Sequence, residues 1–101
     1  MQARVTTSVI QPGKTDEAIR ILRDSIVPAA KQQKGFKGYL GLTDSNMDKS
    51  ISITVWETEA DMKAVEANGY YQEQMAKVAQ LLAGPPTMEH YEVIVREMVR
   101  E

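Results

Sequence analysis

The spacing of apolar residues switches between two periods along this chain, and the order of those switches limits its fold more than any other feature. Residues 3–11 alternate between two faces and are rich in β-branched side chains, which is typical of a strand. Residues 15–34 instead carry apolar side chains three and four apart, which is typical of a helix. The two-residue period returns over 36–43, 50–57 and 88–96, and the stretch between the last two is again helical.

Turn-forming and capping residues mark the ends of the first helical stretch. Pro12 and Gly13 end the preceding strand, and Thr15 is expected to cap the helix with its hydroxyl. Pro28 is expected to kink the helix or begin its unravelling, because proline lacks a backbone N–H. Gly35 is the expected end of the helix.

The second helical stretch is predicted in two pieces. Residues 58–61 read Thr-Glu-Ala-Asp, a capping box with Asp in place of the usual Glu. Asn68 and Gly69 then interrupt the helix, at a point where a gate to a pocket would lie. A second piece begins at Tyr70 and ends before the Gly-Pro-Pro sequence at 84–86.

The order strand, helix, strand, strand, helix, strand selects one topology. Crossovers between parallel strands are right-handed, and the rules for connections leave a four-stranded antiparallel sheet with both helices on one face. We therefore expect an α+β protein with the ferredoxin-like βαββαβ fold. With 101 residues, the chain has the length of a single domain, spanning 1–101.

The polar stretch 44–49 predicts a hairpin between the second and third strands. If that turn pairs Ser45 with Ser50, the register of the two strands follows directly. The pairs expected from it are Leu42 with Ile53, Leu40 with Val55, and Tyr39 with Trp56.

The two faces of the expected sheet differ in character. One face is apolar and collects Val5, Val9, Phe36, Leu40, Leu42, Ile51, Ile53, Val55, Tyr91, Val93 and Val95. The other is mixed and collects Thr6, Ser8, Ile10, Tyr39, Thr54, Trp56, His90, Glu92 and Ile94. We expect the more apolar face to pack against the helices, and a second copy of the sheet in a two-fold dimer to cover the other.

Composition excludes several classes of function. The chain has no cysteine and one histidine, so it has no thiolate metal site or cysteine nucleophile, and one chain cannot assemble a multi-histidine metal site. A net charge of −2 argues against nucleic acid as a partner. No apolar run approaches the roughly 20 residues of a membrane helix, and the first residues lack a signal-peptide pattern, so a cytoplasmic location is expected.

Several short segments together resemble one family. They are Pro12-Gly13-Lys14, Gly35-Phe36-Lys37-Gly38-Tyr39, Val55-Trp56-Glu57-Thr58-Glu59-Ala60, Gly84-Pro85-Pro86 and residues 89–95. In this order the chain is similar to the antibiotic biosynthesis monooxygenase family of dimeric α+β barrels. The most specific part is a Trp that ends the third strand and is followed by a short acidic stretch and a helix.

The resemblance implies a homodimer with a pocket in each subunit between the sheet and the helices. It also implies that the Trp lies near that pocket, in which case the more apolar face would form the dimer barrel, so the assignment of the two faces stays open. Several members oxidise electron-rich aromatics such as anthrones or quinols with oxygen and with neither metal nor flavin, so no cofactor is expected. A related branch degrades haem with an Asn on the first strand, the Trp, and a His on the following helix. This chain keeps Trp56 but has neither the Asn nor that His, so haem degradation is not expected.

Candidate site residues follow from the resemblance and from the mixed face, and each has a structural alternative. Trp56 is the expected pocket wall, or else an ordinary core anchor. His90 is the expected general base because its pKa is ordinarily near neutrality, or else it lies at a strand edge or a dimer interface. Tyr39 is a donor to a developing oxyanion, or else pairs with Trp56 across the hairpin.

Three hydroxyl residues and a second tyrosine complete the candidate pocket. Thr6, Ser8 and Thr54 would form a floor that hydrogen-bonds a substrate, although the same residues also suit a plain strand. Tyr71 is expected on the apolar stripe of its helix.

The sequence therefore leaves two functions open. The first is cofactor-independent oxygenation of a small aromatic, quinol-like or anthrone-like molecule. The second is non-catalytic binding of a small hydrophobic or aromatic ligand by a dimer with the same fold.

Overall fold

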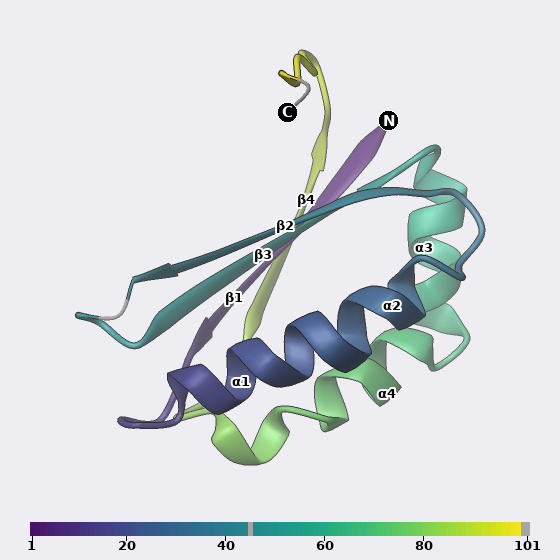
Figure 1. Cartoon of the computed structure of the whole chain (residues 1–101). Coiled ribbons are helices and arrows are strands. Elements are labelled where there is room, and N and C mark those ends of the chain that lie inside the picture. Colours follow the sequence, from purple (N-terminus) through teal and green to yellow (C-terminus); the bar gives the residue numbers. More distant parts are fainter. Residues whose placement is uncertain (45, 100–101) are drawn as a thin grey trace.

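A computed structural model describes residues 1–44 and 46–99 and contains the expected four-stranded antiparallel sheet. The strands are β1 (Gln2–Val9), β2 (Phe36–Asp44), β3 (Lys49–Trp56) and β4 (Thr87–Glu92), in the spatial order β2-β3-β1-β4. Two helical segments cross one face of this sheet and together form a single layer on it (Figure 1). The ferredoxin-like α+β fold predicted from the period switches is confirmed.

The first helical segment is one continuous helix with a wide π-helical turn at its centre. It consists of α1 (Thr15–Ile21), the π-helical segment η1 (Leu22–Ile26) and α2 (Val27–Ala30). The N–H of Val27 donates to the carbonyl of Leu22, five residues back, directly before Pro28. We attribute the wide turn to Pro28, which removes one hydrogen bond and crowds the carbonyl four residues earlier.

The expected cap of this helix is wrong. Lys14 occupies the capping position without a side-chain hydrogen bond, and Thr15 is already helical. Instead of capping, the Thr15 hydroxyl donates to Asp48 Oδ1 at 3.4 Å.

The second helical segment has the predicted break. It consists of α3 (Glu59–Ala67), α4 (Tyr70–Ala76) and the 3₁₀ turn η2 (Ala79–Leu81). Thr58 caps α3 by accepting the N–H of Asp61 at 3.1 Å. Gly69 separates α3 from α4 with φ of 89°, a backbone conformation that glycine adopts without strain. None of the described helices has the length and apolar character needed to cross a membrane.

The hairpin register differs from the predicted one by two residues. Ser45 lies outside the described residues, and its neighbours pair Asp44 with Lys49 and Thr43 with Ser50. The turn has the expected length but begins one residue earlier, and Asp44 Oδ1 accepts the N–H of Asn46 at 3.1 Å. The observed pairs are Leu42 with Ile51, Leu40 with Ile53, Tyr39 with Thr54, and Phe36 with Trp56.

A β-bulge at the start of β2 changes the face of one residue. The pairing passes from Phe36–Trp56 to Gly38–Val55, so Lys37 is the extra residue. The bulge turns Phe36 to the face of Trp56, whereas simple alternation had placed it on the opposite face with Leu40. The two rings meet edge to face, with their centroids 5.6 Å apart.

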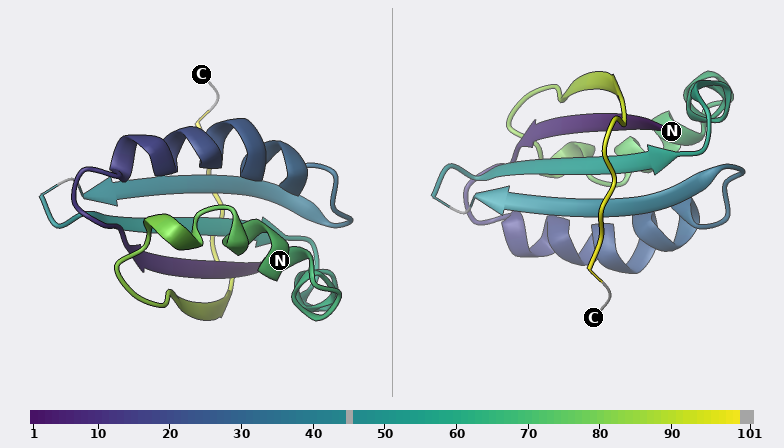
Figure 2. Two further views of the ribbon diagram at one scale, coloured as in Figure 1. Left: turned by 90° about the horizontal axis from the view of Figure 1, so that it is seen from below. Right: turned by 90° about the horizontal axis from the view of Figure 1, so that it is seen from above.

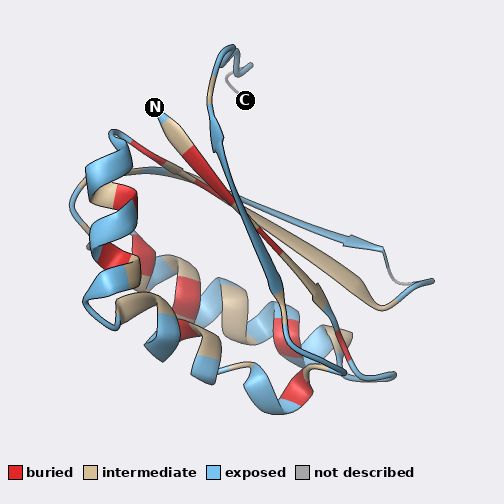
Figure 3. Ribbon diagram, turned by 180° about the vertical axis from the view of Figure 1, so that it is seen from behind, coloured by how far each residue is buried: buried red, intermediate tan, exposed pale blue. Residues whose placement is uncertain are grey.

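Of the two assignments of the sheet faces, the one in which the more apolar face packs against the helices is wrong, and Trp56 lies on the helix side as the resemblance implied. The mixed face carries Trp56, Thr54 and Thr6, and these three side chains are buried beneath the helices. The apolar face is open in the single chain: Leu40 is 51% exposed and Tyr91 is 51% exposed. Figure 2 shows the helices gathered on one side of the sheet, and Figure 3 marks the buried segments of the helices and of the strands.

The last strand is shorter than predicted. β4 ends at Glu92, although the alternating pattern continues to 96. Residues 93–99 form no strand and project away from the helices (Figures 1 and 2). Their apolar side chains are exposed, with Ile94 at 86% and Val99 at 89%.

Candidate functional site

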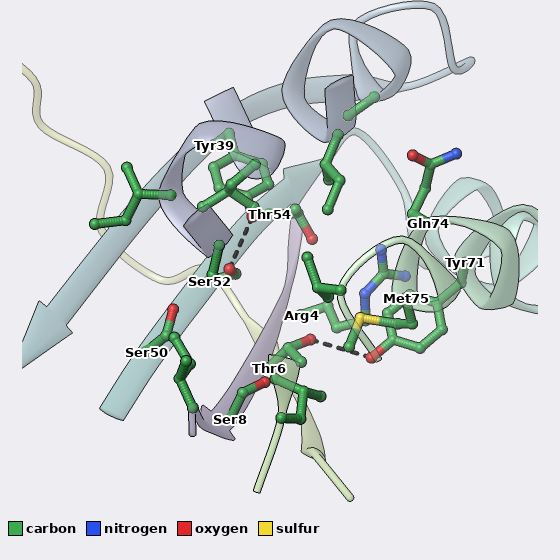
Figure 4. Close-up of a pocket in the computed structure, with 18 of the residues that line it drawn as sticks. Arg4, Thr6, Ser8, Tyr39, Ser50, Ser52, Thr54, Tyr71, Gln74 and Met75 are labelled. Carbon is green, nitrogen blue, oxygen red and sulfur yellow. Dashed lines mark hydrogen bonds between the residues drawn. The ribbon is translucent and has the colours of Figure 1, made fainter. Parts of the chain in front are cut away.

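A pocket lies between the mixed face of the sheet and the two helical segments that cover it. Figure 4 shows this pocket. Its volume is about 90 Å³, against the roughly 10–15 Å³ that one water molecule requires. Strands β1, β2 and β3 form its floor, and α1, η1, α2 and α4 form its roof.

The floor is made of hydroxyl groups. Because successive side chains of a strand point to opposite faces, every second residue of β1 and β3 reaches the pocket. These residues are Thr6, Ser8, Ser50, Ser52 and Thr54. The floor predicted from the sequence, Thr6, Ser8 and Thr54, is thus brought together, and two further serines belong to it.

The roof is apolar. The predicted stripe of the first helix supplies it, together with residues that follow the Asn68-Gly69 break. Its apolar members are Ala18, Ile19, Leu22, Ile26, Ala30, Met75, Val78 and Leu82. A flat molecule between floor and roof would therefore contact hydroxyl groups on one side and aliphatic carbon on the other.

Tyr39 contributes a neutral hydroxyl to the floor. Its phenol donates to Ser52 Oγ at 2.8 Å. Burial raises the pKa of Tyr39 above its ordinary value, and the hydrogen bond to Ser52 only partly offsets that rise. The pairing with Trp56 expected from the sequence is wrong, since Tyr39 lies opposite Thr54.

Trp56 meets both descriptions offered by the sequence. It lines the pocket, and it is also fully buried against Met62 and Val65 of α3. Its indole N–H donates to Thr54 Oγ1 at 3.0 Å, so the ring is held in place from within the sheet. The Trp56 side chain therefore belongs both to the hydrophobic core and to the wall of the pocket.

Arg4 is a pocket residue that the sequence reasoning missed. It is 4% exposed, and its guanidinium lies 4.5 Å from the ring centroid of Tyr71 and 5.5 Å from that of Trp56. Arg4 Nη1 donates to Glu66 Oε2 of α3 at 3.0 Å. A signal was present: Arg4 has the same parity as Thr6 and Ser8, so alternation alone places it on the mixed face.

His90 lies outside the residues that line the pocket. It pairs with Arg4 across β1 and β4, and its Nε2 lies 2.9 Å from Glu66 Oε2. Glu66 therefore contacts both Arg4 and His90, with Arg4 on the pocket side and the partly exposed His90 on the other. A role for His90 as general base stays a prediction.

Two adjacent tyrosines at the start of α4 differ in how their hydroxyls are satisfied. Tyr71 Oη lies 3.3 Å from Thr6 Oγ1, within hydrogen-bond distance. The Tyr70 hydroxyl is enclosed and has no hydrogen-bond partner within residues 1–44 and 46–99. Burial raises the pKa of Tyr70, and the Arg4 charge acts in the opposite direction.

The arrangement suits a small aromatic ligand with a polar group. It offers an apolar roof, a hydroxyl floor, and one end where a buried cation lies beside aromatic rings. Gln74, a further residue missed from the sequence, is 7% exposed at this end and accepts a hydrogen bond from Lys77 Nζ at 2.8 Å. Within the described part of the chain, no three His, Asp or Glu side chains gather as a metal-binding group.

Comparison with known proteins gives a family and a fold. A family profile described as antibiotic biosynthesis monooxygenase matches residues 1–77. A protein of unknown function from Nitrosomonas europaea is 22% identical with a TM-score of 0.78, over 99% of this chain and 95% of the other. No curated protein matches the chain.

Two further solved structures share the fold at lower identity. A monooxygenase of Streptomyces coelicolor, in complex with the ligand nanaomycin D, is 14% identical with a TM-score of 0.80, over 98% of this chain and 92% of the other. A conserved protein from Methanosarcina mazei is 15% identical with a TM-score of 0.74, over 90% of this chain and 91% of the other.

Proposed function

The chain belongs to the antibiotic biosynthesis monooxygenase family, and from that premise we propose that it oxygenates a small aromatic molecule of the anthrone or quinol type without metal or flavin. The observation that carries this proposal is the pocket itself: an apolar roof, a hydroxyl floor and one buried cation, Arg4, beside Trp56.

The proposed reaction needs little from the protein beyond this environment. An anthrone loses a proton from its CH₂ group, the resulting anion gives an electron to O₂, and the two radicals combine at that carbon. One oxygen atom then becomes a new carbonyl and the other leaves as water, so the substrate supplies the electrons. The apolar roof excludes water from the charged species, and the N–H groups of Arg4 and the hydroxyl groups of the floor would donate hydrogen bonds to the oxygen on which negative charge develops.

The reaction also needs a proton acceptor, and His90 is the candidate that the sequence offers. His90 contacts Glu66 rather than the pocket, so its contact with Arg4 runs through that carboxylate. If His90 is the base, His90→Ala should reduce turnover steeply and change its pH dependence. If the variant turns over at the wild-type rate at every pH, the assignment is wrong.

We further propose that two copies of the chain pack through their open apolar faces. Leu40, Leu42, Val9 and Tyr91 are each 45–51% exposed there, and a contiguous apolar surface of this kind typically marks an interface. A second sheet would cover these side chains while leaving both pockets beneath their own helices. Sedimentation of a monomer at micromolar concentration would contradict the proposal.

Non-catalytic ligand binding is the second candidate, and one observation favours it. Within the described lining of the pocket, no histidine or carboxylate is present to move a proton, since His90 and Glu66 lie outside it. A protein with this pocket could hold an aromatic ligand and release it unchanged.

Oxygen uptake distinguishes the two candidates. The protein, freed of metal by chelation, is incubated with anthrone or with hydroquinone against blanks without protein. With ¹⁸O₂, an oxygenase places one labelled atom in the product and one in water. Saturable binding of both compounds with no oxygen uptake above the blank would establish the binder and reject the enzyme.

A further inference from the structure

The only charged side chain among the described residues that line the pocket is Arg4. It is held rigidly, since Tyr71 and Trp56 flank its guanidinium and Glu66 accepts from Nη1. A buried cation is costly to maintain, so its presence in an otherwise neutral cavity calls for a physical account.

The pairing with Glu66 uses only part of the hydrogen-bonding capacity of Arg4. A guanidinium carries five N–H donors, and within the described part of the chain the one hydrogen bond from Arg4 is that of Nη1 to Glu66. Because Arg4 lines the pocket (Figure 4), its remaining N–H groups are available to a ligand there.

Tyr70 packs at the same end of the pocket. Its ring lines the pocket against the group formed by Trp56, Met62 and Val65, and Arg4 lies over the Trp56 ring. The Tyr70 hydroxyl is enclosed, so the donors that a ligand would meet at this end are those of Arg4.

The charge at this end is already balanced. Glu66 neutralises Arg4, so the pair has no net charge to offer a carboxylate or phosphate. What is left is a set of N–H donors in a low-dielectric cavity, which suits a neutral acceptor oxygen.

We propose that Arg4, at the end of the pocket where it lies beside Trp56 and Tyr71, binds a carbonyl oxygen conjugated to an aromatic ring, with the ring of the ligand lying between the hydroxyl floor and the apolar roof. This inference rests on the proposed function and narrows it, because an anthrone carries such an oxygen and a quinol does not. Arg4 is then the residue that sets which end of the ligand enters first.

Two unreactive probes of nearly equal size test the proposal. 1-Tetralone is an aromatic ketone, and tetralin is the same bicyclic molecule without the oxygen. Titration calorimetry on the full chain should show 1-tetralone binding about tenfold more tightly than tetralin, since a hydrogen bond from a charged donor contributes that much.

Variants at the pair then locate the effect. Arg4→Met combined with Glu66→Gln removes both charges together, so no unpaired charge stays buried. It also leaves no N–H donor on the side chain at position 4, and should abolish the preference for the ketone. Arg4→Lys keeps the charge for Glu66 but loses the planar donor set, and should reduce the preference about threefold to fivefold. Tyr91→Phe, on the open face, is the matched control and should leave both affinities unchanged.

Each outcome decides the inference separately from the proposed function. Equal affinities for the two probes in the wild type, or a full preference in the double variant, would overturn the inference while leaving oxygenation open. A preference that disappears in the double variant supports it, even if anthrone is never turned over. Binding of neither probe would overturn the inference, and oxygen uptake with anthrone or hydroquinone would still decide the proposed function.

Discussion

Tyr70 and Tyr71 are neighbours in the chain with opposite hydrogen-bonding states. The Tyr71 hydroxyl meets Thr6, and the Tyr70 hydroxyl meets no partner in the described part of the chain. Both rings line the pocket, so they differ in one atom's surroundings rather than in location. Comparing the two residues therefore measures the free-energy cost of burying a hydroxyl group without a hydrogen-bond partner.

Removing each hydroxyl should therefore change stability in opposite directions. Tyr70→Phe removes an unsatisfied polar atom and should leave the free energy of unfolding unchanged or raise it by up to about 1 kcal/mol. Tyr71→Phe breaks the contact with Thr6 and should lower it by about 1 kcal/mol. Urea titrations of the two variants measure this, and an equal loss in both would show that Tyr70 is satisfied in solution.

Burial of Tyr39 predicts a loss of stability in alkaline solution. Its pKa is raised above 10.0, mainly by burial. A phenol with a raised pKa contributes stability that is complete below the pKa of the unfolded chain and is lost as pH rises through the folded value. Unfolding free energies measured from pH 9 to 11 should therefore fall, and Tyr39→Phe should make that fall smaller. Part of the fall should persist, because burial also raises the pKa of Tyr70.

At the scale of elements, local irregularities decide which side chains lie beneath the helices. The bulge at Lys37 turns Phe36 toward Trp56, and the wide turn in η1 keeps Leu22 and Ile26 over the floor despite Pro28. Each irregularity changes the direction of a side chain without changing the order of elements.

The same irregularities explain what sequence reasoning could reach. Alternation predicts the floor at Thr6, Ser8 and Thr54 because β1 and β3 run without interruption. It misplaces Phe36, because a bulge inserts one residue and no residue type at Lys37 announces it. The predicted hairpin register was wrong by two residues. Two residues are one full period of a strand, so each side chain after the bulge was still assigned to the correct face of the sheet. The link from Arg4 through Glu66 to His90 joins three elements, and no local pattern contains it.

Gly35 is an element boundary that tolerates no side chain. Its φ is +82°, and an added Cβ would overlap the Asp61 side chain, including the Asp61 Cβ, which rotation cannot move aside. Gly35→Ala should lower the free energy of unfolding by about 2 kcal/mol or more. Gly13→Ala is the control, because Gly13 has φ of +81° with nothing within 4 Å. Gly13→Ala should lower the free energy of unfolding by about 1 kcal/mol. Thermal or urea unfolding measures both variants, and an equal loss in the two would show that the overlap with Asp61 does not contribute.

At the scale of the whole molecule, the sheet separates two environments. Polar side chains and the pocket lie beneath the helices, and the apolar residues lie on the open side with the tail at 93–99. A single chain of this kind places its more hydrophobic sheet surface in water, which is unfavourable in proportion to the area exposed. The proposed pairing of two sheets removes that cost.

A charge on the open face should therefore separate the copies without unfolding them. Leu40→Glu places a carboxylate where the side chain is 51% exposed in the single chain, so the fold should survive while association weakens at least tenfold. Analytical ultracentrifugation across protein concentrations measures the shift. Ile94→Glu on the projecting segment, at 86% exposure, tests whether that segment takes part in the same contact.

Trp56 is the one tryptophan of the chain, and it stands with no exposed surface where the pocket meets the core. All indole emission from this protein therefore originates at a single place, beside Arg4 and next to any occupant of the pocket. The molecule carries its own optical reporter, so filling and emptying of the pocket can be followed in real time without a label.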